Sequence, residues 1–368
     1  MPRIASPSRS QSSHAPGAMI RSAPWWALAL MLILPAAGPL RAVEPVATVR
    51  VAFDRAGITE TATAGLADVA AGRAISADDP ARIASISKLV VAIGVMRLVE
   101  AGTLDLDADV STQLGWTLRH PRWPGTPITL RLLLSHRASL TDAAGYYAVP
   151  LDGALAEVVQ DPRAWDDAHA PGTWFRYTNL NFPLVAAVME SATGERFDLL
   201  MQRLVLAPLG IAGCYNWDAC DDATAARAVV LYGSDGQAVR DDHHGRKPAC
   251  NVVPASDGNC DLGQWRAGRN GATFSPQGGL RISVNGLAKI GRLLLGDGEV
   301  DSVRLLSARS VQTLLTPVWR QGSDGGVTYE EDTADSSSHG FLCRYGLATQ
   351  ALATAQADRR EGPFGGRR

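Results

Sequence analysis

Residues 81–100 of this chain read ARIASISKLVVAIGVMRLVE. Behind Ser85 the residues are almost all apolar and Gly102 follows, which is typical of a helix that is buried on most of its sides. A helix of this kind lies in the middle of a domain, so we expect the rest of the chain to pack around it. Ser85 and Lys88 fall in its first turn, where residues three apart share a face and their side chains can meet.

This pair predicts a serine nucleophile with an amine as its base. An amine that is partly desolvated at the positive end of a helix loses its proton more easily, so Lys88 can take the proton of the Ser85 hydroxyl. The alternative is a polar pair that only starts a core helix, since Ser-x-x-Lys also arises by chance. Chance is less favoured because the chain has three lysines, Lys88, Lys247 and Lys289, and one of them has this spacing.

The first 42 residues have the composition of a secretory signal peptide. Arg3, Arg9 and Arg21 precede the apolar run of residues 25–37, and small residues with a cleavage point expected near Ala42 follow. The run is too short to span a bilayer comfortably, which argues against a stable membrane anchor. We therefore expect a periplasmic or secreted protein.

The charge balance and the cysteine spacing indicate which partners and which kinds of cysteine site to expect. The 35 basic and 37 acidic residues form no long run of one sign, so no nucleic-acid partner is expected. In an exported protein, the short loops between cysteines predict the disulfides Cys214–Cys220 and Cys250–Cys260, with Cys343 left over. A zinc site is the alternative, but the sequence has no Cys-x-x-Cys motif.

The other segments predict a mixture of strands and helices. Residues 46–53 and 59–65 read as two strands joined by a turn at Gly57. Residues 214–270 have few apolar runs and are expected to form loops. Further helices are expected at residues 128–135 (with Thr129 as N-cap), 151–160, 183–192, 196–206 and 284–295.

Five segments carry a more specific signal. They are Arg82–Lys88, Ile128–His136, Pro171–Asn179, Pro208–Gly210 and Ser275–Leu280. Together they resemble the serine hydrolase family that contains class C β-lactamases, penicillin-binding DD-peptidases and related esterases. The segments run in the order of that family and cover roughly residues 46–347, which is far more specific than the Ser-x-x-Lys motif alone.

The resemblance implies roles for four residues. The nucleophile of the family corresponds to Ser85, its amine to Lys88, and its Tyr-x-Asn element to Tyr177 and Asn179. A tyrosine hydroxyl beside a lysine ammonium gives up its proton more readily and can relay it to the leaving group. The Asn179 amide can hold Lys88 and bind a substrate carbonyl. Without the serine and the lysine, Tyr177 would read as an ordinary half-buried aromatic.

The resemblance also implies the fold and the reaction. The fold would be α+β, of the β-lactamase/DD-peptidase type, with an antiparallel sheet built from residues of about 46–82 and 270 onward and a helical region that holds Tyr177. The reaction would be hydrolysis of a small ester or amide, with β-lactams and D-amino-acid peptides among the options, through an acyl-enzyme on Ser85. No metal and no organic cofactor are implied, and we expect a monomer.

One element of the family is not found in the sequence. A lysine or histidine, then a small residue and a glycine, should follow residues 345–347 on an edge strand beside the nucleophile, where they supply an N–H of the oxyanion hole. Residues 348–368 are instead low in apolar residues and rich in Gly and Arg, which predicts a disordered tail. We therefore expect a truncated domain of residues 43–347 whose C-terminal strands are incomplete.

Two short matches to this element have the wrong setting. His243-His-Gly245 precedes the turn at Ser275, and Lys289-Ile-Gly291 lies inside the helix predicted at residues 284–295. Loss of one oxyanion donor typically costs about 10²–10³ in rate. The alternative to an active hydrolase is thus a non-catalytic or acylation-only protein.

Overall fold

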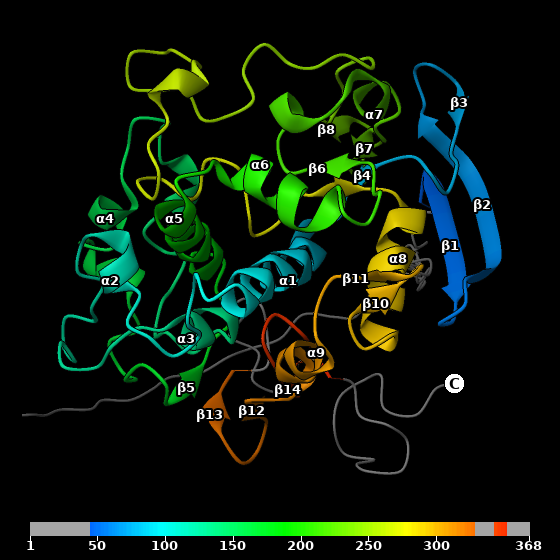
Figure 1. Ribbon diagram of the computed structural model, residues 1–368. Helices are drawn as coiled ribbons and strands as arrows, with labels where there is room; N and C mark the ends of the chain where they lie inside the picture. Colours follow the sequence, from blue (N-terminus) through cyan, green and yellow to red (C-terminus); the bar gives the residue numbers. More distant parts are fainter. Residues whose placement is uncertain (1–44, 328–341, 352–368) are drawn as a thin grey trace, which may run out of the picture. The chain divides into compact units, whose positions relative to one another are not determined.

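The computed structural model describes residues 45–327 and 342–351, and Figure 1 shows their arrangement. The predicted signal peptide lies outside the described residues and stays a prediction, as does the export that depends on it. Among the helices of the described ranges, none is long and apolar enough to cross a membrane.

The helix expected at the centre is α1 (Ser87–Glu100), which follows the 3₁₀ turn η1 (Ala84–Ile86). Most of its residues are buried, which confirms a helix covered on most sides. It packs against the π-helical turn η4 (Gln202–Leu206) and against α9 (Ala308–Leu315), and Figure 1 shows it between them. A Cβ at Gly94 would lie 2.7 Å from the sulfur of Met201, so the glycine permits close helix packing here.

Next to α1 lies the second buried helix, α5 (Asn181–Thr193). Pro183 is in its first turn, as predicted, where the missing N–H costs no hydrogen bond. The helix packs against α2 (Ser111–Leu114), α3 (Leu130–Leu134) and α6 (Phe197–Met201). Thr129 caps α3 as predicted, since its hydroxyl accepts from the backbone N–H of Leu132.

Two sheets flank these helices. In the first, β1 (Ala47–Phe53) and β2 (Ile58–Asp68) form the predicted hairpin, and β3 (Arg73–Ala74) adds to β2. The predicted helix α8 (Val284–Leu295) packs against β1, as Figure 1 shows, and Ser283 is its N-cap. All strand pairs in this sheet are antiparallel.

The second sheet connects segments that are distant in sequence. Its order is β4 (Ala81–Arg82), β9 (Arg281–Ile282) and β6 (Gly213–Cys214), again antiparallel. The single sheet expected from residues 46–82 and 270 onward is therefore divided in the described residues. In the described residues β9 pairs with β4 and β6 and not with the hairpin.

Short elements complete the fold. β5 (Trp174–Phe175) pairs in parallel with β13 (Gly325–Gly326), and β12 (Trp319–Arg320) pairs with β14 (Arg344–Tyr345). The helix expected at residues 151–160 is shorter in the structure and comprises only α4 (Leu155–Val158). The N–H of Leu155 donates to the carbonyl of Arg269 and not to a carbonyl one helical turn earlier. The others are η2 (Tyr146–Ala148), η3 (Pro162–Ala164), η5 (Trp217–Ala219), α7 (Asp222–Ala226), β7 (Leu231–Tyr232), β8 (Ala238–Arg240), η6 (Leu262–Gln264), β10 (Glu299–Val300) and β11 (Val303–Arg304).

Both predicted disulfides are present. The Cα atoms are 5.2 Å apart in Cys214–Cys220 and 5.5 Å apart in Cys250–Cys260. Their sulfurs are therefore not available as zinc thiolates. The fifth cysteine, Cys343, is buried and belongs to neither bond.

The structure describes the first residues of the predicted tail, up to residue 351. Ala348 is buried and its N–H donates to the carbonyl of Leu134, and Gln350 bridges to Tyr345. Residues 352–368 lie outside the described residues, so disorder of the tail and incomplete C-terminal strands stay predictions.

Candidate active site

The chain reaches Ser85 through an unusual backbone conformation. After β4 the N–H of Ile83 donates to the carbonyl of Leu280, and Ala84 then adopts a left-handed conformation with φ of +46°. This φ is uncommon for a residue with a side chain and costs conformational energy. The turn places Ser85, which is half-buried, at the entrance to α1.

Lys88 is the polar centre of the site. Its side chain lies inside the protein, with 1% of the residue exposed. The ammonium Nζ donates to Ser85 Oγ, to Asn179 Oδ1 and to the carbonyl oxygen of Gln277, each at 2.9 Å. An ammonium group has three protons and can donate to all three of these acceptors. The structure thus brings Ser85, Lys88 and Asn179 together, as the sequence predicted.

Tyr177, the fourth predicted residue, lies beside this group. Lys88 Nζ is 4.9 Å from the centre of the tyrosine ring, and 9% of Tyr177 is exposed. The ring stacks on His136, with 4.3 Å between the centroids and 26° between the planes. The Tyr-x-Asn element follows β5 and precedes α5, so a sheet edge and a buried helix fix both of its ends.

His136 is a buried group that the sequence did not single out as part of the site. Its Nδ1 accepts from the N–H of Thr178 at 3.1 Å and lies 3.2 Å from the Asn181 amide nitrogen. Burial, and next the charge of Lys88, hold the pKa of His136 well below its usual range. Both effects favour the neutral ring, whose Nδ1 accepts from Thr178 and whose face stacks on Tyr177.

Asp142 is a second residue that sequence reasoning missed. Its Oδ2 accepts from the backbone N–H of Asn179 at 2.9 Å and from Nδ2 of the same residue at 3.0 Å, and its Oδ1 accepts from the N–H of Leu180 at 2.9 Å. The carboxylate fixes which way the Asn179 amide points, because it can only accept. No local pattern indicates these contacts, because the partners are 37 and 38 residues apart in the chain.

The carbonyl of Gln277 is the third unpredicted group. It belongs to the turn of the family-like segment Ser275–Leu280, in which the N–H of Gly279 donates to the carbonyl of Ser275 at 2.7 Å. A Cβ at Gly279 would lie 2.7 Å from that of Ser275, so the turn requires glycine. The N–H of Leu280 donates to Ser87 Oγ at 3.2 Å, which attaches the turn to the start of α1.

The site opens into a cleft of about 810 Å³ that Ser85 and Asn179 both line. One wall carries Tyr146 and Tyr147, and the turn at Phe274 forms another part. Other lining residues come from residues 214–270, which the sequence predicted only as loops. Both disulfides support this part of the cleft, because residues 215–217 lie inside the first cysteine loop and residues 251–253 inside the second.

The two short matches to the Lys/His-x-Gly element of the family lie outside the position expected for that element. Lys289 is on α8, where its Nζ pairs with Asp301 at 3.0 Å. His243 lines the cleft and packs edge-on against Trp217, with 5.6 Å between the ring centroids, but it follows β8 in a loop. Neither residue is on a strand beside Ser85.

An α+β fold whose central helix begins with a serine and a buried lysine, beside a Tyr-x-Asn element, defines a class of serine hydrolases. The chain belongs to the family described as Beta-lactamase, which it matches over residues 46–354. The predicted family and fold type are therefore confirmed.

Known relatives include esterases and peptidases. Esterase EstB of Burkholderia gladioli is 32% identical over 168 residues, which are 41% of this chain and 42% of that protein. The D-alanyl-D-alanine-carboxypeptidase/endopeptidase AmpH of Escherichia coli strain K12 is 30% identical over 143 residues, 36% of each chain. The chain thus spans less than half the length of these curated relatives.

A solved structure shows the same fold over most of the chain. EstCE1, a hydrolase with promiscuous acyltransferase activity, superposes with a TM-score of 0.58 at 20% identity, over 85% of this chain and 79% of that one. At this identity the likeness concerns the fold alone.

Proposed function

We propose that this chain hydrolyses a small ester or amide through an acyl-enzyme on Ser85. The observation that carries the proposal is the contact of 2.9 Å between Lys88 Nζ and Ser85 Oγ, in a cleft large enough for a small substrate. The esterase and peptidase names of the relatives support the same reaction class. The test described below addresses whether the natural substrate is an ester, a D-amino-acid peptide or a β-lactam.

The hydrogen bonds around Lys88 also suit its neutral form. A neutral amine has two N–H groups and one lone pair, and the oxygens of Asn179 and Gln277 can only accept. They take the two N–H groups, so the lone pair of Lys88 faces Ser85. In this arrangement the amine accepts the serine proton while both other bonds persist.

The proposed reaction has two halves. The Ser85 proton passes to Lys88 Nζ as Oγ bonds to the substrate carbonyl carbon, and the backbone N–H of Ser85 stabilises the oxyanion. The bond to the leaving group then breaks, and that group takes a proton through the Tyr177 hydroxyl. In the second half, water attacks the acyl carbon and gives a proton to Lys88 Nζ. The bond between that carbon and Ser85 Oγ then breaks, the acid leaves, and Lys88 returns the proton to Oγ.

The alternative is a protein that is acylated without turnover, or one that only binds. This alternative is kept because residues 348–368 contain no Lys/His-x-Gly element, the family element that supplies a second oxyanion donor. Against it stand the contacts of Lys88, whose Nζ lies at hydrogen-bond distance from Ser85 and Asn179 and 4.9 Å from the centre of the Tyr177 ring.

We also propose that the protein acts after export and as a monomer. The disulfides Cys214–Cys220 and Cys250–Cys260 are compatible with an oxidising compartment, and the apolar run before Ala42 is the expected export signal. Fractionation of cells and mass-resolved gel filtration test these two points.

Mass spectrometry of the intact protein tests the proposed function. The protein is exposed separately to a fluorophosphonate and to a penicillin, and the labelled peptide is mapped, with Ser85→Ala and the surface variant Ser256→Ala as a matched pair. A hydrolase gives an adduct on Ser85 together with turnover of an aryl ester, and both are lost in Ser85→Ala alone. An adduct without turnover supports the acylation-only alternative, and folded protein without any adduct supports a binding role.

A further inference from the structure

The cleft that holds Ser85 has a basic end. Arg82 on β4, Arg240 on β8 and Arg281 on β9 line it, and Asp241 is the acidic residue among its lining residues. Arg82 and Arg281 are direct cross-strand partners in the antiparallel pair of β4 and β9. Like charges in that position repel each other, so the fold must compensate for them.

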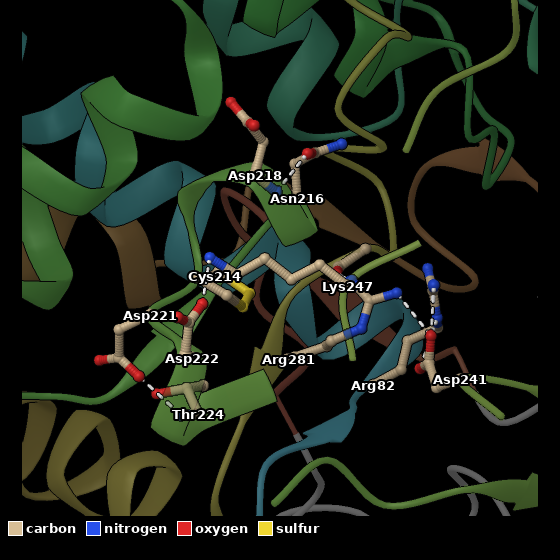
Figure 2. The surroundings of a disulfide bond; sticks show 12 residues. Arg82, Cys214, Asn216, Asp218, Asp221, Asp222, Thr224, Asp241, Lys247 and Arg281 are labelled. Carbon is tan, nitrogen blue, oxygen red and sulfur yellow. Dashed lines mark hydrogen bonds and ion pairs between the residues drawn. A yellow bond between two sulfur atoms is a disulfide. The ribbon is translucent and has the colours of Figure 1, made fainter. Parts of the chain in front are cut away.

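Asp241 provides part of this compensation, as Figure 2 shows. Its Oδ1 accepts from Nη2 of Arg281 at 2.6 Å and from Nη2 of Arg82 at 3.2 Å. The Asp241 and Arg281 side chains are almost fully buried, with 2% and 4% exposed, and that of Arg82 is 21% exposed. A single carboxylate therefore serves two guanidinium groups, and Arg240 adds a third positive charge.

The charge of Arg281 is incompletely compensated. Burial, together with the charges of Arg82 and Arg240, lowers the pKa of Arg281 to about 10, although Asp241 raises it. Its Nε is buried and has no hydrogen-bond partner among the described residues. The Trp217 ring covers the guanidinium, with Cζ 3.9 Å from the ring centroid. Three arginines that share the single carboxylate of Asp241 leave this end of the cleft positive, which attracts an anion.

We infer that Arg82, Arg240 and Arg281 form a subsite for a carboxylate of the substrate, separate from the group that attacks the scissile bond. The inference rests on the proposed function. Arg82 precedes Ser85 by three residues, so their Cα atoms are within about 11 Å of each other. A carboxylate a few bonds from the scissile carbonyl can therefore reach the arginines while that carbonyl is at Ser85, and the field of the cleft attracts such anions.

Two esters of equal chain length test the inference. The 4-nitrophenyl monoester of glutaric acid carries a terminal carboxylate where 4-nitrophenyl pentanoate has a methyl group. We expect kcat/KM for the glutarate to exceed that for the pentanoate by about 10-fold or more, and the ratio to fall with added salt. A second pair, phenyl butyrate with and without a carboxylate on the leaving group, shows which side of the substrate the arginines contact. Equal rates within both pairs would overturn the inference.

Variants of the exposed Arg240 test whether the arginines cause the preference for the glutarate, and they leave the buried ion pair of Asp241 and Arg281 in place. Arg240→Gln is expected to lower the preference for the glutarate about 3- to 10-fold, and Arg240→Glu to abolish or reverse it. Arg309→Gln, an exposed arginine on α9 outside the cleft, is the matched control and should leave the preference unchanged. An unchanged preference in Arg240→Glu would show that the cluster is only structural.

Failure of the proposed function gives a different pattern. In that case neither ester is hydrolysed and the fluorophosphonate leaves Ser85 unlabelled. A binding measurement then tests the subsite without catalysis. Monomethyl glutarate should raise the melting temperature of the protein at concentrations where methyl pentanoate does not, and this shift should be absent in Arg240→Glu. No shift with either compound contradicts the subsite.

Discussion

The carboxylate of Asp142 accepts a hydrogen bond of 3.0 Å from the side-chain amide nitrogen of Asn179. The amide oxygen of Asn179 is thereby turned toward Lys88 Nζ, 2.9 Å away. Asp142 is therefore connected to Ser85, the proposed nucleophile, through Asn179 and Lys88, and we expect it to be a positioning residue.

Asp142→Asn is expected to slow acylation of Ser85 about 10- to 100-fold. In the variant an NH2 group replaces one of the two carboxylate oxygens that accept from Asn179 and Leu180. Two donors then face each other, so the Asn179 amide loses its fixed orientation. The rate of labelling by a fluorophosphonate measures the effect, and Asp152→Asn, at a carboxylate that binds Ser256 on the surface, is the control. In an Asn179→Ala background the same change should add little, and full additivity would contradict action through Asn179.

Tyr177→Phe is expected to lower kcat for ester hydrolysis by about 10²–10⁴. The phenyl ring can keep the stack on His136 and the contact with Lys88, so the proton relay is lost while the packing remains. Steady-state kinetics and circular dichroism of the two proteins measure activity and fold. A variant that is folded and as active as the wild type would remove Tyr177 from the relay.

His136 makes the stability of the protein depend on pH. Its pKa in the folded chain is far below the value of 6.5 that it regains on unfolding, so below about pH 6.5 the unfolded state binds more protons. Stability should then fall with decreasing pH, by up to about 1.4 kcal/mol per pH unit from this group.

His136→Asn removes this contribution. Asparagine offers an acceptor for the N–H of Thr178 and tolerates the φ of +56° at this position. Urea unfolding at pH 5, 6 and 7 should show the difference in unfolding free energy between wild type and variant shrinking or reversing toward low pH. A difference that stays constant over this range would show that His136 is protonated in the folded protein as it is in the unfolded one.

Ala84→Gly is expected to stabilise the protein by about 0.5–1 kcal/mol. Glycine adopts the φ of +46° without strain, and the exposed methyl group of Ala84 contributes little buried area. Ala71→Gly is the matched control, because Ala71 is exposed and has an ordinary negative φ, so glycine there should destabilise. Urea midpoints of the two variants, one higher and one lower than the wild type, check the prediction.

Several features could be predicted because they are local in sequence. The bounds of α8 follow from its amphipathic period and from Gly296 at its end, and the hairpin of β1 and β2 follows from two apolar runs around Gly57. The disulfides join cysteines that are only 6 and 10 positions apart. Ser85 and Lys88 are three residues apart, so the turn η1 and the first turn of α1, which follow each other directly, are enough to bring them together.

The sequence by itself thus determined the central helix, its serine and lysine, and the family. Only the tertiary structure decided which groups surround them, since the acceptors on Asn179 and Gln277 come from 91 and 189 residues beyond Lys88. The same holds for Arg82 and Arg281, which become neighbours through the pairing of β4 with β9. Helix period and capping are properties of neighbouring residues, whereas the electrostatics of the cleft depend on contacts that form only when distant segments pack.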